Sequence, residues 1–453
     1  MSTQTYTFPR GIRPPEGKSL AENNAIEILP TPKKLFLPVQ QHIGAPCAPV
    51  VKLKDEVGPD AVVASADAFV SAPIHAPYAG TVGRPAKKTL PNGRRVATVA
   101  LDVDLDHAPS GEEMLKLVYG GDWEIPADFD VNSIFPAVKS GGLVGMGGAA
   151  FPTHVKIAKN EKKPIDTILI NGCECEPYLT ADYRLMLEYP QPIVVGAILT
   201  AAAVGAKTVY ICIEDNKPAA IQIVSKAIEK TSNPFGVDVS VRVMKTKYPQ
   251  GGEKQLIRAA LGRKVPFPGL PMDVGALVEN VSTAAAVAGR VLRGKALTHR
   301  IVSVTGGGVV NPKNLFVPIG TPISELIEFC GGLKSDANRI LMGGPMMGFA
   351  VGTTDIPVTK GTSGITVLTN SEVKKSVETN CVRCGRCVGV CPMNLIPTKL
   401  ALASRFQNTD VLQAYHVAAC IECGSCAFTC PASLPLVQLI RTGKIQVQKL
   451  SKK

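Results

Sequence analysis

Two stretches near the end of the chain determine the class of its last domain: CVRCGRCVGVCP at residues 381–392 and CIECGSCAFTCP at residues 420–431. Each has three cysteines separated by pairs of residues, a fourth cysteine after three further residues, and then a proline. The two stretches hold eight of the 13 cysteines of the chain. A ligand pattern repeated at the same spacing indicates two similar sites built from thiolates.

This spacing is that of bacterial two-cluster ferredoxins. Two-residue gaps let a tight loop direct three thiolates at three corners of a cubane. The fourth cysteine is expected to start a helix pointing the other way, so that it serves the other cluster, and the proline stops that helix from extending back. The predicted ligands are Cys381, Cys384, Cys387 and Cys430 for cluster one, and Cys420, Cys423, Cys426 and Cys391 for cluster two.

Zinc sites and disulfides are the alternatives to clusters. Zinc sites use two Cys-x-x-Cys pairs and need no further cysteines in this register, and disulfides are unusual in a cytosolic chain. The stretch Thr398–Ala419 between the quartets is typical of a helix, because apolar side chains punctuate polar ones. A helical domain with two [4Fe–4S] clusters is therefore predicted for residues 371–453. Its Arg383 and Arg386 place positive charge near the sulfurs, which tunes cluster potential.

The whole chain has 453 residues, 45% of them hydrophobic and 19% charged, which predicts a folded protein of several domains. No apolar run reaches the length of a membrane span, and Pro192–Ala206 is predicted to be a buried helix. Met1–Lys18 lacks the apolar stretch of a secretory signal. The net charge of +12 fits either an ordinary solvated surface or an anionic neighbour, such as an acidic electron carrier, a nucleotide or the cytoplasmic membrane face. No basic run suggests nucleic acid.

After an N-terminal arm (1–32), residues 33–128 are predicted to form a β domain of short strands. Expected strands are Val50–Lys52, Val62–Ala64, Gly80–Val82 and Val96–Val103. The segments 52–57 and 74–82 resemble the barrel-sandwich half-motif of biotinyl and lipoyl carrier domains. The hairpin Phe69–Pro73 has no carrier lysine, so a structural role is favoured, and His75 is expected to be packed inside.

Residues 129–298 alternate strands with helices, as in an α/β domain. Thr167–Asn171 and Thr208–Glu214 are the expected strands, and Ala219–Lys230 is an expected helix. The run SGGLVGMGGAAFPT at residues 140–153 precedes the first strand. Such a loop brings backbone amides close to a phosphate, because glycine has no Cβ to hold the ligand away. A flexible turn is the alternative for this loop.

Residues 299–370 are predicted to form a further β unit with a connector. Val302–Thr305 and Leu315–Pro318 read as strands, and Pro322–Phe329 reads as a helix that ends at two glycines. The second glycine-rich run, 343–348, favours a tight turn beside the cluster domain.

These features together resemble the C subunits of ion-translocating Rnf electron-transport complexes. The resemblance extends over nearly the whole chain and rests on GIRPPEGK at 11–18, the 140–153 loop, NGCECEPYLT at 171–180, YPQGGE at 248–253 and the two cysteine quartets. That family is itself similar to the flavin subunit of respiratory complex I, which binds FMN and oxidises NADH. The resemblance implies the same order of domains, with residues 299–370 as an SLBB-like β-grasp unit.

The resemblance to the complex I subunit also implies site residues, motif by motif. Around FMN it implies Gly145, Gly147, Gly148, Phe151, Lys156, Asn171, Glu174, Glu176, Tyr248, Gly251, Gly252, Glu253, Asn280 and Thr283. Within this set, Glu253 and Glu174 are expected to shape the nicotinamide and ribose pocket as catalytic residues.

Two positions depart from the complex I pattern. Gly252 replaces the first of two glutamates, and Glu279 replaces one of two adjacent asparagines. FMN remains the expected cofactor, whereas NAD(H) or a different carrier is the expected partner in electron exchange. Cys173 and Cys175 are expected to be buried structural thiols. A redox or metal role beside the flavin is the alternative.

The resemblance implies a peripheral oxidoreductase subunit on the cytoplasmic face of the cell membrane. It would pass electrons between NADH or another carrier, FMN and the clusters, with ferredoxin reached indirectly and ion transport left to the other Rnf membrane and Fe–S subunits. A flavin is chemically suited to this place, because it exchanges electrons both in pairs and singly. The alternatives are a soluble reductase, such as a cobalamin reductase, and an Fe–S electron wire with a degenerate flavin site.

Overall fold

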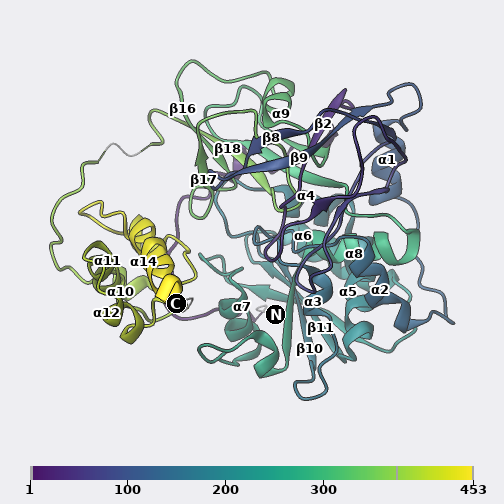
Figure 1. The fold of residues 1–453 in the computed structure, drawn as a ribbon. Helices are drawn as coiled ribbons and strands as arrows, with labels where there is room; N and C mark the ends of the chain where they lie inside the picture. Colours follow the sequence, from purple (N-terminus) through teal and green to yellow (C-terminus); the bar gives the residue numbers. More distant parts are fainter. Residues whose placement is uncertain (1–3, 374–375, 451–453) are drawn as a thin grey trace.

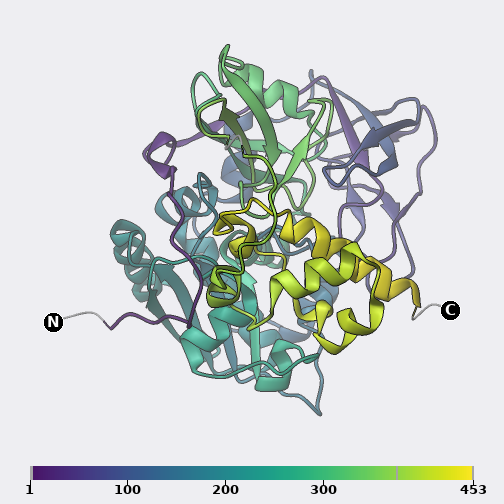
Figure 2. The same cartoon turned by 90° about the vertical axis from the view of Figure 1, so that its left-hand side faces the viewer.

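The computed structural model describes residues 4–373 and 376–450. A small helical unit, α10 to α14, lies beside a larger body that contains the four sheets (Figures 1 and 2). Along the chain, a first β unit is followed by an α/β unit, a second β unit and the helical unit. The predicted fold class is confirmed.

The α/β unit is built on a parallel sheet with strand order β12-β11-β10-β13. Buried apolar runs form its two central strands, as expected where helices cover both faces. Its strands are β10 (Thr167–Gly172), β11 (Thr208–Glu214), β12 (Asp238–Met244) and β13 (Ala276–Asn280), and its helices are α2 (Ile134–Ser140), α3 (Thr153–Lys156), α4 (Ala181–Glu188), α5 (Pro190–Val204), α6 (Pro218–Lys230), α7 (Glu253–Leu261) and α8 (Val281–Arg293).

Helix α5 is the buried helix expected at Pro192–Ala206. It packs so closely on α8 that a Cβ on Gly196 would come within 1.7 Å of the carbonyl oxygen of Ala284, so only glycine fits there. In the described residues, no single helix is long and apolar enough to cross a membrane, although α4 and α5, bent by 97°, pass that test as a pair.

The first β unit consists of a five-stranded and a three-stranded sheet. The strands are β2 (Lys34–Pro38), β3 (Ala48–Pro49), β4 (Glu56–Val57), β5 (Val62–Ser65), β6 (Ile74–His75), β7 (Gly80–Val82), β8 (Ala86–Thr89) and β9 (Arg95–Val103), and α1 (Gly111–Val118) follows them. The prediction of a strand at Val50–Lys52 is wrong, because β3 ends at Pro49 and the chain turns at Lys54, whose φ is +73°. His75 is buried as expected, and burial lowers its pKa to about 3.

The second β unit is a six-stranded sheet with the order β1-β15-β14-β18-β16-β17. Strand β1 comes from the N-terminal arm and pairs in parallel with β15, a long-range contact that no local pattern predicts. The strands are β1 (Ile26–Ile28), β14 (His299–Thr305), β15 (Lys313–Pro318), β16 (Ala337–Met342), β17 (Phe349–Val351) and β18 (Gly364–Thr369), with α9 (Ile323–Phe329) packed on them.

The helical unit contains α10 (Arg386–Val390), α11 (Pro397–Arg405), α12 (Thr409–Ala414), α13 (Ser425–Phe428) and α14 (Leu436–Leu450). The helix expected across Thr398–Ala419 is broken at Gln407, whose φ is +53°. The expectation that the fourth cysteine of each quartet starts a helix is also wrong. Cys391 ends α10 and Cys430 follows α13, because a residue before proline disfavours the helical conformation.

Lys360 joins three parts of the body. Its buried ammonium nitrogen lies 2.6 Å from the carbonyl oxygen of Pro73 and 2.7 Å from that of Gly142, while its backbone N–H donates to Gln41. Burial lowers the pKa of Lys360 from 10.5 to about 7. The unfolded chain therefore holds this proton up to a higher pH than the folded chain, and this residue adds stability as the pH rises from about 7 towards 10.5.

We predict that Lys360→Met flattens the pH dependence of stability in that window. Relative to the variant, the wild type should gain about 1.4 kcal/mol of unfolding free energy per pH unit. Urea unfolding at several pH values between 7 and 9.5 measures this, with the exposed Lys139→Met as the control. Parallel curves for wild type and Lys360→Met would contradict the lowered pKa.

Candidate functional site

The glycine-rich loop between α2 and α3 closes on itself and is anchored to α8. The backbone N–H of Gly145 donates to the carbonyl of Phe151 at 2.8 Å. Between these residues, the N–H of Met146 donates to the hydroxyl of Thr283 at 2.8 Å, and the Arg300 guanidinium donates to the carbonyl of Met146. The loop is therefore held at the beginning of α8.

The start of α8 is capped by Asn280, which ends β13. Its side-chain oxygen accepts from the N–H groups of Ser282 and Thr283, and its amide nitrogen donates to Asp182 at 2.6 Å. A Cβ on Gly147 would lie 3.5 Å from the Cβ of Asn280, so the loop crosses directly over this cap. A helix N-terminus under a glycine loop is a favourable place for a phosphate.

Lys156 and two glutamates form the charged side of this loop. The Lys156 ammonium donates to the carbonyl of Val278 at 2.9 Å and lies 3.5 Å from the carboxylate of Glu253. Burial alone would lower the pKa of Lys156, but the carboxylates of Glu279 and Glu253 outweigh it and raise the pKa. Lys156 is thus a fixed positive charge at neutral pH.

The motif residues on β10 and before α7 are brought together. Asn171 donates from its amide to the carbonyl of Gly251 at 2.9 Å and accepts from the N–H of Cys173. The N–H of Gly251 points to the sulfur of Cys175 at 3.4 Å, and Gly252 is the residue before α7. Asn171 therefore fixes the two loops against each other.

Glu174 and Glu176 are committed to other segments. The Glu174 carboxylate accepts from the N–H groups at the start of α4, Asp182 at 2.8 Å and Tyr183 at 3.1 Å. Glu176 accepts from the N–H groups of Met346 and Met347. Burial raises the pKa of both carboxyls. The structure thus places Glu253, Lys156 and Glu279 beside the glycine loop, and gives Glu174 and Glu176 partners that hold the loop 174–179 in place.

Sequence reasoning missed Lys18. Its ammonium is buried and donates to the carbonyls of Glu174, Glu176 and Leu179, so it binds the loop that carries the NGCECEP motif. Lys18 ends the segment 11–18 that carried part of the resemblance, and this was the only signal for it. Asp182, which orients Asn280, had no signal.

The residues around the glycine loop fit FMN. At Gly148, where φ is +108°, an added Cβ would meet nothing within 4 Å, so the loop has an open side. Within the described parts of the chain, several buried polar atoms at the motifs have no hydrogen-bond partner, among them one carboxylate oxygen of Glu279 and both side-chain amide atoms of Gln250. Buried polar atoms of this kind require a partner, which a polar cofactor provides.

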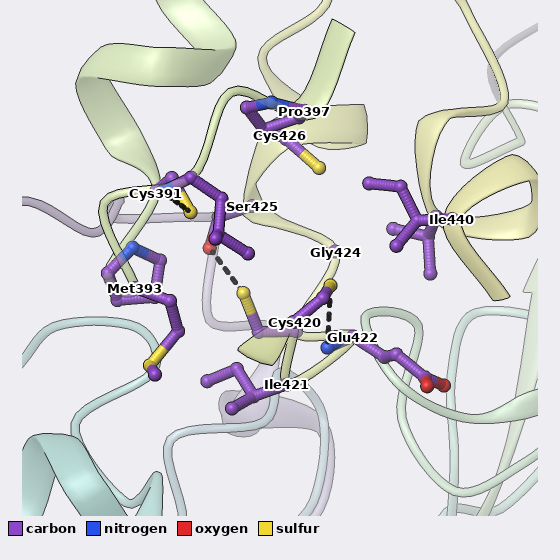
Figure 3. Close-up of a pocket in the computed structure, with 14 residues that line it drawn as sticks. Cys391, Met393, Pro397, Cys420, Ile421, Glu422, Gly424, Ser425, Cys426 and Ile440 are labelled. Atoms are coloured by element: carbon purple, nitrogen blue, oxygen red, sulfur yellow. Dashed lines mark hydrogen bonds between the residues drawn. The ribbon is translucent and has the colours of Figure 1, made fainter. Parts of the chain in front are cut away.

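A cavity in the helical unit is lined by Cys391 together with Cys420, Cys423 and Cys426. The sulfur atoms of Cys391, Cys420 and Cys426 point into it (Figure 3). Burial raises the pKa of Cys426, and the neighbouring thiols of Cys423, Cys420 and Cys391 raise it further. The fourth cysteine of the first quartet thus lines the same cavity as the first three cysteines of the second quartet.

The remaining cysteines of the two quartets are those predicted for cluster one: Cys381, Cys384, Cys387 and Cys430. Burial raises the pKa of Cys387, and the nearby Cys430 thiol raises it further. The N–H of Thr379 donates to the carbonyl of Ala432, which brings the segment before Cys381 alongside the residues after Cys430.

Backbone amides also point at the sulfurs. The N–H of Arg383 lies 3.4 Å from the sulfur of Cys381, and the N–H of Glu422 lies 3.4 Å from that of Cys420. The two loops therefore repeat the same N–H to sulfur geometry, which stabilises thiolate ligands of clusters. All 13 cysteines are free of disulfides. The donor sets fit two [4Fe–4S] clusters.

Tyr248 connects the flavin loops to the helical unit. Its hydroxyl donates to the carbonyl of Cys423 at 2.7 Å, and its side chain is buried in an apolar contact with Ile12 and Cys175. Cys173 is buried as expected, whereas Cys175 is partly exposed and packs in the same group as Cys423.

Four family descriptions match successive parts of the chain. They are the RnfC barrel sandwich hybrid domain at 6–106, the Nuo51 FMN-binding domain at 138–289, the SLBB domain at 301–350 and a 4Fe–4S dicluster domain at 380–434. FMN and two [4Fe–4S] clusters are the cofactors of such a chain, and it is an electron-transfer subunit of the oxidoreductase class.

Three curated relatives are similar over most of their length. The C subunit of the proton-translocating ferredoxin:NAD(+) oxidoreductase complex of Clostridium ljungdahlii is 42% identical, over 87% of this chain and 84% of its own. The Na(+)-translocating counterpart of Acetobacterium woodii is 41% identical, over 88% of each chain. The C subunit of the ion-translocating oxidoreductase complex of Rhodobacter capsulatus is 40% identical, over 88% and 75%. The chain belongs to the family of Rnf complex C subunits.

Membership makes this chain one subunit of a larger complex, and it does not favour the stand-alone reductase or the degenerate electron wire. Among solved structures, an NAD+-reducing [NiFe]-hydrogenase in its air-oxidised state matches with a TM-score of 0.51 at 19% identity, over 76% of this chain and 66% of the other. At that identity the likeness concerns the fold alone.

We predict that Lys156→Met weakens FMN binding by roughly ten- to a hundredfold, because one charge-assisted contact contributes about 1.5–3 kcal/mol. Quenching of flavin fluorescence on titration of the flavin-free chain measures the affinity. Lys156→Arg should retain most of it, and the exposed Lys159→Met is the matched control. Equal affinity in wild type and Lys156→Met would exclude this lysine from the flavin site.

We also predict that each cluster takes its fourth cysteine from the other quartet, and that the iron content of double variants shows this. Cys391→Ser with Cys423→Ser removes two ligands of one cluster and should leave about four irons per chain. Cys391→Ser with Cys387→Ser removes one ligand from each cluster and should leave far fewer. If each quartet held its own cluster, these two results would be reversed.

Proposed function

We propose that this chain is the peripheral subunit through which an Rnf-type complex exchanges electrons with NAD(H). The named activity of the relatives, ferredoxin:NAD(+) oxidoreduction, supports this. In the proposal, electrons pass between NADH or another carrier, FMN and the two clusters, while other membrane and Fe–S subunits translocate the ion and meet ferredoxin. The chain would sit at the cytoplasmic face of the membrane.

The proposed roles of the site residues follow from their contacts. The amides of the 145–151 loop and the start of α8 would hold the flavin phosphate with Lys156, while Asn171, Tyr248, Gly251 and Thr283 would shape the remaining flavin contacts. Glu253 is the proposed catalytic residue facing the nicotinamide, because its carboxylate is partly exposed beside Lys156.

Glu174 is proposed to act on the same pocket through the loop it supports. Its carboxylate accepts from the N–H groups at the start of α4, and the Lys18 ammonium donates to the carbonyls of Glu174 and Glu176. Because Gly252 has no side chain, Glu253 is the acidic residue that this loop offers to a substrate. NAD(H) is the proposed substrate, with another carrier as the alternative.

One observation supports a proposed order of the redox sites: the Tyr248 hydroxyl donates a 2.7 Å hydrogen bond to the carbonyl of Cys423. Tyr248 belongs to a flavin motif and Cys423 to the cluster-two set. FMN supplies the change from paired to single electrons. We therefore place cluster two between the flavin site and cluster one, so that electrons from the flavin reach cluster one through cluster two.

This order predicts different effects of losing each cluster. In Cys423→Ser, NADH should still bleach the flavin absorbance, but cluster one should receive electrons far more slowly than in the wild type. In Cys384→Ser, cluster two should be reduced at the wild-type rate. Rapid-freeze EPR after mixing with NADH measures both. Normal reduction of cluster one in Cys423→Ser would contradict the order, and an unbleached wild-type flavin would contradict NADH as the donor.

A further inference from the structure

Cluster one lies on an outer face of the helical unit. Every residue from 376 to 386 is exposed, including Cys381 and Cys384, whereas the four cysteines of the cluster-two set are buried or partly buried. This segment follows the side of the helical unit that faces away from the body, before it enters α10 (Figure 1). Cluster two, in contrast, faces the body through Tyr248 and Met346.

Large exposed apolar side chains lie in this segment and at the end of α11. The Arg405 guanidinium pairs with Glu378 at 2.5 Å, which brings the end of α11 alongside it. Leu402 and Phe406, one helical turn apart, flank this arginine. The outer face is defined by four apolar residues and their exposed fractions: Val377 85%, Phe406 73%, Val382 63% and Leu402 58%. Such a group of exposed apolar side chains marks an interaction surface.

The charge of the outer face is positive. Arg383 and Arg386 are exposed, and neither forms an ion pair with a residue in the described parts of the chain. In the same unit, Glu378 is paired with Arg405, and Glu422 with Arg441 and Lys444. An acidic partner would therefore meet two free guanidinium groups around an apolar centre, the usual arrangement of a transient interface.

We propose that this outer face docks an acidic iron–sulfur protein that exchanges electrons with cluster one. The inference rests on the proposed function and adds the place and chemistry of the partner. A redox protein is favoured over a membrane because two of the cluster-one cysteines, Cys381 and Cys384, lie within the exposed segment itself. One electron passes from the reduced cluster of one protein to the oxidised cluster of the other, and no bond or proton changes.

The test compares two variants of equal charge change. Val377→Glu with Phe406→Glu adds two negative charges to the outer face without altering a cluster ligand or its neighbours. Lys116→Glu makes the same change on α1, which lies on the opposite side of the molecule (Figure 1). The probe is an acidic two-[4Fe–4S] ferredoxin, which stands in for an acidic iron–sulfur subunit and is titrated against the flavin- and iron-loaded chain by calorimetry at low and high salt.

We expect the wild type to bind the ferredoxin and to lose affinity as salt rises, because salt screens the attraction. The double variant should bind roughly tenfold more weakly or worse, and Lys116→Glu within about twofold of the wild type. Iron content and flavin absorbance verify that each variant carries its cofactors.

Three results would overturn the proposal: no binding by the wild type at low salt, equal weakening by both variants, or unchanged ferredoxin binding by the double variant. In a parallel flotation assay with phosphatidylglycerol vesicles, loss of vesicle binding by the double variant with intact ferredoxin binding would assign the face to the membrane instead. Reduction of the chain's own clusters by NADH, followed in the same samples, tests the proposed function separately.

Discussion

The position of Tyr248 determines how the two redox parts of the molecule meet. Its backbone N–H and carbonyl both pair with Ile12 of the N-terminal arm, and its hydroxyl donates to the carbonyl of Cys423. A buried hydroxyl needs a partner, so the tyrosine specifies where the cluster-binding loop can lie. The arm strengthens this contact, because the N–H of Gly11 donates to the carbonyl of Val390 at the end of α10.

The flavin side of this junction depends on one buried and two half-buried ionisable side chains. Lys18 binds three carbonyls of the loop 174–179, while the carboxylates of Glu174 and Glu176 join this loop to α4 and to the segment at Met346. Burying a charge is unfavourable unless it is well partnered. This unfavourable burial occurs where the flavin site, the second β unit and the helical unit come together. The position of the loop 174–179 therefore matters to function.

The cysteine pattern allowed the cluster-binding domain to be predicted, because spacing within a few residues dictates which thiols share a loop. The glycine loop itself was also predictable from its composition, whereas Thr283, which binds the loop from 137 residues away, was indicated only by the resemblance to a family. The partners of Glu174 and Glu176 could not be found this way, because Met346 lies 170 residues from Glu176. The same holds for β1, whose strand partner is far along the chain. The helix break at Gln407, where φ is +53°, had no glycine or proline to signal it.

The most direct measurement is an iron anomalous map from crystals of the chain loaded with flavin and iron. The account predicts two groups of four irons, of which the one nearer the Tyr248 hydroxyl is bound by Cys391, Cys420, Cys423 and Cys426. It also predicts flavin density over the 145–151 loop on the other side of Tyr248. Iron bound by Cys381, Cys384 and Cys387 at the position nearest Tyr248 would contradict the account.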